Sequence, residues 1–97
     1  MDISVQELKS RLDAGDKFIF IDVREPHEYD EFNIGAKLIP LATIPDAIAE
    51  LEAHKHDEII IHCRSGIRSG NAQMFLQQVG FTNVRNVEGG VLAWKAM

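Results

Sequence analysis

The sequence predicts an α/β fold in which helices cover both faces of a mostly parallel central sheet, giving three layers. Short apolar segments rich in isoleucine and phenylalanine alternate along the 97 residues with segments whose apolar residues recur at helical spacing. No repeat or low-complexity linker interrupts this alternation. A hydrophobic content of 45% suffices for one core, so we expect residues 1–97 to form a single domain.

The first third of the chain predicts a helix, a strand and a second helix. Ser4 and Glu7 have the spacing of a capping box, which indicates a helix over residues 5–14. Residues 18–21 are all apolar, as in a strand that is covered on both faces. A proline suits the first turn of a short helix over residues 27–32.

The middle third predicts two strands with a helix between them. Residues 37–39 indicate a short strand that the following proline ends. Thr43 can cap a helix whose buried stripe runs from Ile44 to Leu51. Residues 58–62 are the most strand-like segment, and we expect them in the middle of the sheet.

The last third predicts a helix, a strand and a second helix. Ser69 can begin a helix whose apolar face extends to Val79 and which Gly80 ends. Residues 84–87 indicate the last strand. A pair of glycines then makes a tight turn before a brief closing helix, in which Trp94 packs inward.

Charge and residue types exclude several classes of protein. The net charge of -5 argues against nucleic acid as a partner, since phosphate binding relies on a basic face. No apolar run approaches the ~18 residues of a membrane span, and the N-terminus lacks signal-peptide features, so we expect a cytoplasmic protein. The single cysteine excludes an intrachain disulfide and dithiol redox chemistry. The four histidines lack metal-ligand spacing, and we expect no metal and no cofactor.

Two polar segments follow predicted strands, at the edge of a parallel sheet where ligands bind. Asp22 and Arg24 follow the first strand, and Cys63 directly follows the strand over residues 58–62. We therefore expect both segments to lie at one site.

The loop after the second of these strands favours a cysteine thiolate. Backbone amides and the positive end of a following helix stabilise a thiolate over a thiol. Arg64 and Arg68 add positive charge, while Ser65 and Gly66 let the backbone N–H groups converge on an anion. The sequence therefore predicts that Cys63 is a nucleophile in a small anion cradle. A buried structural cysteine is the alternative, since free cysteine is often found in protein cores.

The length of this loop distinguishes two chemistries that use such a cradle. Cysteine phosphatases resemble Cys-x-x-x-x-x-Arg, whereas Arg68 lies five positions after Cys63 and Ser69 occupies the sixth. A tighter ring encloses the oxygens of a phosphate less well than a single sulfur atom carried by Cys63. Phosphatase or arsenate reductase activity is therefore the less favoured alternative.

Four segments, taken in order, resemble those of single-domain rhodaneses across nearly the whole chain. They are residues 19–25 with Glu28 and Tyr29, residues 60–69, residues 80–84 and residues 88–94. The resemblance implies the rhodanese fold and a sulfurtransferase that works through a persulfide on Cys63. It also implies thiosulfate or another small anionic sulfur compound as donor, and cyanide, a thiol or a protein as acceptor.

The resemblance further implies roles for the residues around Cys63. The expected substrate-binding residues are Arg64, Ser65, Gly66, Ile67, Arg68, Ser69 and Arg24. Asp22 is expected to orient the loops, and a structural charge network is the alternative for Asp22, Arg24 and Glu28. His62 is expected to point away from the thiolate, because neighbouring side chains of a strand face opposite sides of the sheet.

One segment departs from the rhodanese pattern. Residues 32–36 lack the glycine and histidine of many rhodaneses and are one residue shorter. We expect this departure to alter donor preference more than the chemistry at Cys63. It also leaves a second function open, in which the domain is a sulfur carrier or docking module that serves a biosynthetic enzyme.

Overall fold

The computed structural model describes residues 1–97 and contains a four-stranded sheet in which all the paired strands are parallel. The strands are β1 (Ile19–Asp22), β2 (Lys37–Leu38), β3 (Ile59–His62) and β4 (Val84–Asn86). Their order in the sheet is β2-β1-β3-β4. β3 therefore lies inside the sheet, as the sequence predicts.

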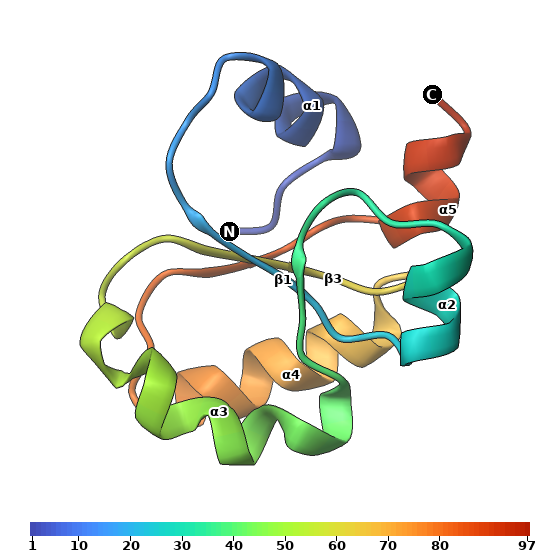
Figure 1. The fold of residues 1–97 in the computed structure, drawn as a ribbon. Coiled ribbons are helices and arrows are strands. Elements are labelled where there is room, and N and C mark those ends of the chain that lie inside the picture. Colours follow the sequence, from blue (N-terminus) through green and yellow to red (C-terminus); the bar gives the residue numbers. More distant parts are fainter.

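Five α-helices surround the sheet. They are α1 (Val5–Asp13), α2 (Pro26–Glu31), α3 (Ile44–Leu51), α4 (Ile67–Gln78) and α5 (Gly90–Lys95). Two 3-10 turns, Leu41–Thr43 and Glu52–His54, flank α3. α3 and α4 lie on one side of the sheet, and α1 and α5 lie on the other (Figure 1). This arrangement confirms the predicted three-layer α/β fold, and none of its helices is long and apolar enough to cross a membrane.

The residues of β3 alternate between two hydrophobic cores, one on each face of the sheet. Ile59 and Ile61 belong to the larger core, which includes residues of α3 and α4. Ile60 belongs to the smaller core, which includes residues of α1. All three side chains are fully buried, and each such burial contributes ~2 kcal/mol to folding. The buried strand β3 therefore fixes the position of the residue that follows it, Cys63.

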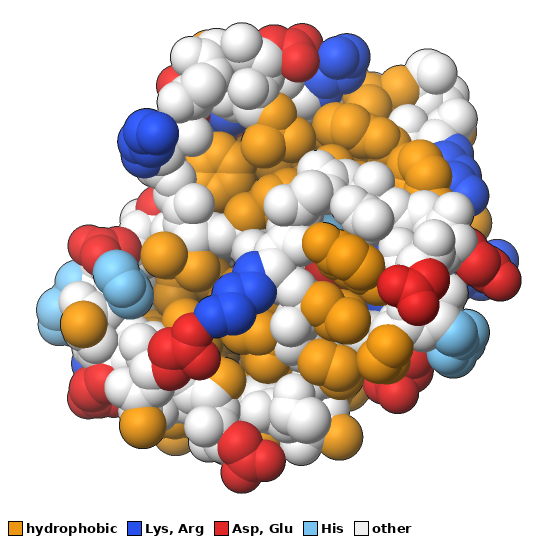
Figure 2. Space-filling model, in the orientation of Figure 1, with side chains coloured by type: hydrophobic (Ala, Val, Ile, Leu, Met, Phe, Trp, Pro, Cys, Tyr) orange, Lys and Arg blue, Asp and Glu red, His pale blue; other side chains and the backbone are white.

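The smaller core is covered incompletely. Apolar side chains are visible between α1 and α5 in the space-filling view (Figure 2). The partly buried side chains that pack against this core are Leu12, Phe18, Phe20, Ala93 and Trp94. Trp94 thus packs inward from α5, as the sequence predicts.

The predicted cap of α3 and the predicted burial of β1 are both partly wrong. Thr43 does not cap α3, because its backbone is helical rather than extended and its hydroxyl donates to the carbonyl oxygen of Pro40 at 2.8 Å. In β1, only Ile21 and Asp22 are buried, whereas the first two residues are half-buried. Of these two, Ile19 packs against the larger core and Phe20 against the smaller one.

α4 begins earlier than predicted, and its buried face ends before Val79. The helix starts at Ile67, two residues before Ser69, because Gly66 adopts a left-handed conformation (φ 105°) that turns the chain into the helix. Val79 lies beyond the last helical residue and is 37% exposed, so it does not share the buried face. Gly80 follows with φ 101° and ends the segment, as the sequence predicts.

Candidate active site

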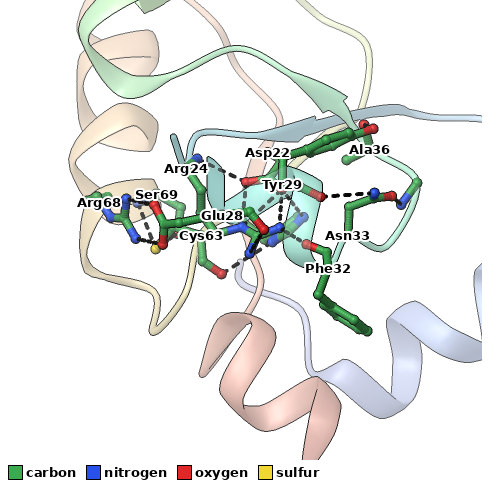
Figure 3. Close-up of polar contacts among 12 residues, drawn as sticks. Asp22, Arg24, Glu28, Tyr29, Phe32, Asn33, Ala36, Cys63, Arg68 and Ser69 are labelled. Atoms are coloured by element: carbon green, nitrogen blue, oxygen red, sulfur yellow. Dashed lines mark hydrogen bonds and ion pairs between the residues drawn. The ribbon is translucent and has the colours of Figure 1, made fainter. Parts of the chain in front are cut away.

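Cys63 lies directly after β3, where the chain turns into α4. Its Sγ accepts hydrogen bonds from the backbone N–H of Gly66 at 3.1 Å, from the backbone N–H of Ser69 at 3.4 Å and from the Ser69 hydroxyl at 3.3 Å. Cys63 is 1% exposed, and Figure 3 shows Ser69 beside its sulfur. The N–H groups of the loop therefore converge on a sulfur atom that is largely shielded from water.

This environment favours the thiolate form of Cys63. Burial raises the pKa of the thiol, because a charge is less stable away from water. The hydrogen bonds from Ser69 and Gly66 stabilise the anion and outweigh burial, so the pKa of the Cys63 thiol lies below its usual value. Because the thiolate is the nucleophilic form of cysteine, the site can support attack on an electrophilic atom.

Backbone hydrogen bonds from α5 hold the loop in this conformation. The N–H groups of Val91 and Leu92 donate to the carbonyl oxygens of Cys63 and Arg64, each at 3.0 Å. Gly90 permits this approach, because a Cβ atom there would lie only 2.6 Å from the Arg64 oxygen. These bonds fix the start of the loop, whose later N–H groups, those of Gly66 and Ser69, bind the sulfur.

Asn86 is a site residue that the sequence analysis did not single out. It is the last residue of β4 and is 9% exposed. Its Nδ2 donates to the carbonyl oxygen of Gly66 at 2.9 Å, and its Oδ1 accepts from the Ser69 hydroxyl at 2.6 Å. The one available signal was its position, since a polar residue that ends a strand next to β3 lies at the ligand-binding edge of the sheet.

Asp22 and Arg24 form a buried ion pair at the end of β1. Their side chains are 0% and 5% exposed, and Arg24 Nη2 lies 2.8 Å from Asp22 Oδ2. Arg24 also donates to the carbonyl oxygens of Phe32 at 2.7 Å and Glu28 at 3.4 Å (Figure 3). These contacts tie β1 to α2 and occupy the guanidinium, which favours the structural interpretation of Arg24 over direct contact with a substrate.

Arg68 is paired rather than free. Its Nη1 and Nη2 donate to the two carboxylate oxygens of Glu28 at 2.7 and 2.9 Å, which joins α4 to α2. The hydrogen bonds from Arg68 lower the pKa of Glu28 to about 2. Arg64, in contrast, is exposed and has no side-chain hydrogen bond or ion pair. The loop thus presents one engaged arginine and one available arginine.

His62 points away from Cys63, as the sequence predicts. Its ring packs against Phe20 with centroids 5.4 Å apart, on the opposite face of the sheet from the larger core. Nδ1 contacts the carbonyl oxygen of Cys63 at 3.3 Å, while the buried Nε2 has no hydrogen-bond partner and lies 3.6 Å from Asp22 Oδ2. Burial lowers the pKa of His62, so this imidazole is kept neutral.

A cleft of about 460 Å³ lies beside the loop. Its walls include the cationic side chains Arg64 and Lys95 and the apolar side chains Phe32 and Leu92. Lys95 lies over the Phe32 ring, with its nitrogen 4.4 Å from the ring centroid. The segment that departs from the rhodanese pattern therefore contributes a wall residue to the cleft. No group of three or more His, Cys, Asp or Glu side chains is arranged to hold a metal ion.

The residues expected at the site thus lie at one edge of the sheet, although in different roles. Asp22 ends β1, and Cys63 directly follows the neighbouring parallel strand β3. Gly66 and Ser69 contact the sulfur, whereas Arg64, Ser65 and Ile67 are exposed. Together they define an α/β domain with a single cysteine in a cradle of backbone amides.

The chain belongs to the rhodanese-like domain family. The family description, Rhodanese-like domain, matches residues 4–97. "Putative sulfurtransferase YtwF" of Bacillus subtilis is 39% identical over 95 residues, which cover 97% of this chain and 89% of the relative. The crystal structure of a rhodanese-like domain protein from Staphylococcus aureus superposes with a TM-score of 0.85 and 35% identity, covering 97% of this chain and 91% of that one.

Longer proteins also contain this domain. "Probable adenylyltransferase/sulfurtransferase MoeZ" of Mycobacterium tuberculosis H37Rv is 34% identical over 93 residues. The match covers 95% of this chain but 24% of the relative, so the chain spans about a quarter of that protein's length. The name sulfurtransferase is thus shared by relatives of about the size of this chain and by much larger ones.

Proposed function

We propose that the protein moves sulfane sulfur from a small anionic donor such as thiosulfate to a thiophilic acceptor, through a persulfide on Cys63. The observation that carries this proposal is the convergence of the Gly66 and Ser69 N–H groups and the Ser69 hydroxyl on Cys63 Sγ. These donors favour the thiolate that must attack, and the same cradle suits the anionic sulfur that the attack leaves behind.

The proposed reaction has two displacement steps. In the first, the Cys63 thiolate attacks the outer sulfur of thiosulfate, a new S–S bond forms, and sulfite leaves with the electron pair of the broken S–S bond. In the second, cyanide or a thiolate attacks the terminal sulfur of the persulfide, and the Cys63 thiolate is released. Each step transfers one sulfur atom and needs no further oxidant or reductant.

Positive charge for the donor comes first from Arg64 in this proposal. Arg64 is exposed, lines the cleft and is not engaged by a carboxylate. Arg68 is held by Glu28 and contributes mainly to the field around the sulfur. Ser65 and Ile67 remain proposed contacts at the exposed rim of the loop, whereas Arg24 is proposed to act structurally, held in place by Asp22.

Addition of one sulfur mass to the protein tests this function directly. Incubation with thiosulfate, followed by intact-protein mass spectrometry, should show the adduct, and cyanide should remove it. Because Cys63 is the only cysteine, Cys63→Ala must abolish the adduct completely. A wild-type protein that stays unmodified with thiosulfate and with other sulfane sulfur donors would contradict the proposal.

The second candidate function is that of a sulfur carrier or docking module for a biosynthetic enzyme. The observation that favours it is the match to one quarter of a longer relative whose name combines adenylyltransferase and sulfurtransferase. Slow cyanide turnover together with fast sulfur transfer from a protein persulfide would favour this function over the first. Phosphatase or arsenate reductase activity stays less favoured, because Arg68 lies five positions after Cys63 and is paired with Glu28.

A further inference from the structure

The Ser69 hydroxyl lies between two acceptors although it carries one hydrogen. Its Oγ is 3.3 Å from Cys63 Sγ and 2.6 Å from Asn86 Oδ1. Cys63 and Ser69 are at most 1% exposed and Asn86 is 9% exposed, so the hydroxyl has little access to water as a third partner. The hydrogen must therefore be assigned to one of the two acceptors at any moment.

The orientation of the Asn86 amide makes this competition definite. Its Nδ2 donates to the carbonyl oxygen of Gly66 at 2.9 Å, which turns Oδ1 toward Ser69. A carbonyl oxygen can only accept, so the Ser69 oxygen must donate whenever it is bound to Asn86. The lone pairs of the hydroxyl then face Cys63, where they can accept an S–H hydrogen but cannot stabilise a thiolate.

We propose that Asn86 is a positioning residue that acts on Cys63 through Ser69, by holding the hydroxyl hydrogen while Cys63 is a thiol and releasing it to the sulfur when Cys63 ionises. Ionisation gives the S–H proton to water, and the O–H bond of Ser69 then rotates from Asn86 Oδ1 to Sγ. The role rests on the proposed function, because only a nucleophilic Cys63 makes this adjustment useful.

The exchange has a cost that depends on Asn86. When the hydroxyl turns to the sulfur, Asn86 Oδ1 loses its partner in a buried position, and an unpartnered buried acceptor is unfavourable. Asn86 therefore limits how far Ser69 can lower the pKa of the thiol. Removing Asn86 should let Ser69 stabilise the thiolate more strongly.

A double-mutant cycle on the thiol pKa tests this assignment. The acid dissociation constant of Cys63 is measured from the pH dependence of iodoacetamide alkylation in the wild type, Ser69→Ala, Asn86→Ala and the double variant. We expect Ser69→Ala to lower this constant in both backgrounds, by at least about threefold more in the Asn86→Ala background. The Gly66 contact is lost in both Asn86→Ala proteins, so its effect cancels in the cycle.

Two further variants keep the test decisive. Asn86→Asp gives the Ser69 hydroxyl a stronger acceptor, so Ser69→Ala should change the acid dissociation constant of Cys63 less in that background. This variant also keeps the test possible if Asn86→Ala does not fold. Gln73→Ala removes another contact between α4 and β4, the 2.9 Å hydrogen bond to the Val84 carbonyl oxygen, and should leave the thiol constant unchanged. Equal effects of Ser69→Ala in all Asn86 backgrounds would overturn the proposal.

The alkylation assay contains no sulfur donor, so its outcome is separate from that of the thiosulfate experiment. Coupling between Ser69 and Asn86 without an adduct from thiosulfate or other sulfane sulfur donors would support the hydrogen-bond exchange and refute the proposed function. A sulfur adduct together with a cycle that shows no coupling would do the reverse.

Discussion

Replacing Gly90 with alanine should damage both the fold and the reactive thiol. Gly90 has φ 54°, and a Cβ atom there would lie 2.6 Å from the Arg64 carbonyl oxygen and closer still to that of Cys63. These are the two carbonyls that α5 binds to hold the loop. A methyl group would therefore push the loop away from α5. The Gly66 and Ser69 N–H groups of the loop, which donate to the Cys63 sulfur, would move with it.

The expected cost of Gly90→Ala is about 3 kcal/mol. A left-handed backbone costs a residue with a side chain ~1 kcal/mol, and forcing a methyl group against packed atoms costs ~2 kcal/mol more. Gly15→Ala is the matched control, because Gly15 also has a positive φ (74°) but a Cβ atom there would meet nothing within 4 Å. The control should cost ~1 kcal/mol, from the backbone alone. A chain of this size has a stability of roughly 5–15 kcal/mol, so both variants should still fold.

Urea unfolding followed by Trp94 fluorescence gives the two free energies, and iodoacetamide alkylation of Cys63 gives the state of the thiol. Gly90→Ala should lose about 2 kcal/mol more than Gly15→Ala and should slow alkylation at pH 7 by at least about threefold, since amide hydrogen bonds to the thiolate weaken. Equal stability losses in the two variants would refute the steric reasoning. A normal alkylation rate in Gly90→Ala would refute the link between α5 and the thiol.

Three further predictions concern buried and paired charges. Glu28→Gln should lower the free energy of unfolding at pH 7 by only about 1 kcal/mol, because Arg68 is one third exposed and solvent weakens the ion pair. Arg68 lowers the pKa of Glu28 to about 2, so the wild type should keep its full stability advantage over the variant above pH ~4.5. In urea titrations, this advantage should decline as the pH falls toward 2. Burial lowers the pKa of His62, so the unfolded state binds its proton more readily than the folded state. The free energy of unfolding should therefore decrease as the pH falls below about 6.5, and it should decrease less steeply in His62→Gln. Identical slopes of this free energy against pH in the two proteins would contradict the prediction. Asp22→Asn should cost about 3 kcal/mol because it leaves the buried charge of Arg24 without its partner, and an unchanged urea midpoint would show that the pair is dispensable.

The fold was predictable because local patterns carried most of the information. The apolar run before Cys63 allowed a buried parallel strand and little else, and it forms β3 with all four residues buried. A cysteine after such a strand, in a sheet that binds ligands at its carboxyl edge, had to lie at that edge. The errors at helix starts arose because Gly66 and Thr43 adopt conformations that spacing alone does not reveal.

The partners of the site were not predictable in the same way. Arg68 and Glu28 are 40 positions apart, and their pairing depends on how α4 lies against α2. The sequence near Cys63 therefore suggested that Arg68 is free to bind a substrate, whereas in the structure it is paired with Glu28. Asn86 was missed for a related reason, because its importance comes from the neighbouring strand and not from its own surroundings in the chain.

The dependence of the loop on α5 has a consequence for biosynthesis. Cys63 is made well before Val91 and Leu92, the residues whose N–H groups bind the Cys63 and Arg64 carbonyls. Domains emerge from the ribosome N-terminus first, so a nascent chain that lacks these residues carries a cysteine with ordinary acidity. We therefore expect the pKa of the thiol to fall below its usual value only once the last helix has docked on the loop.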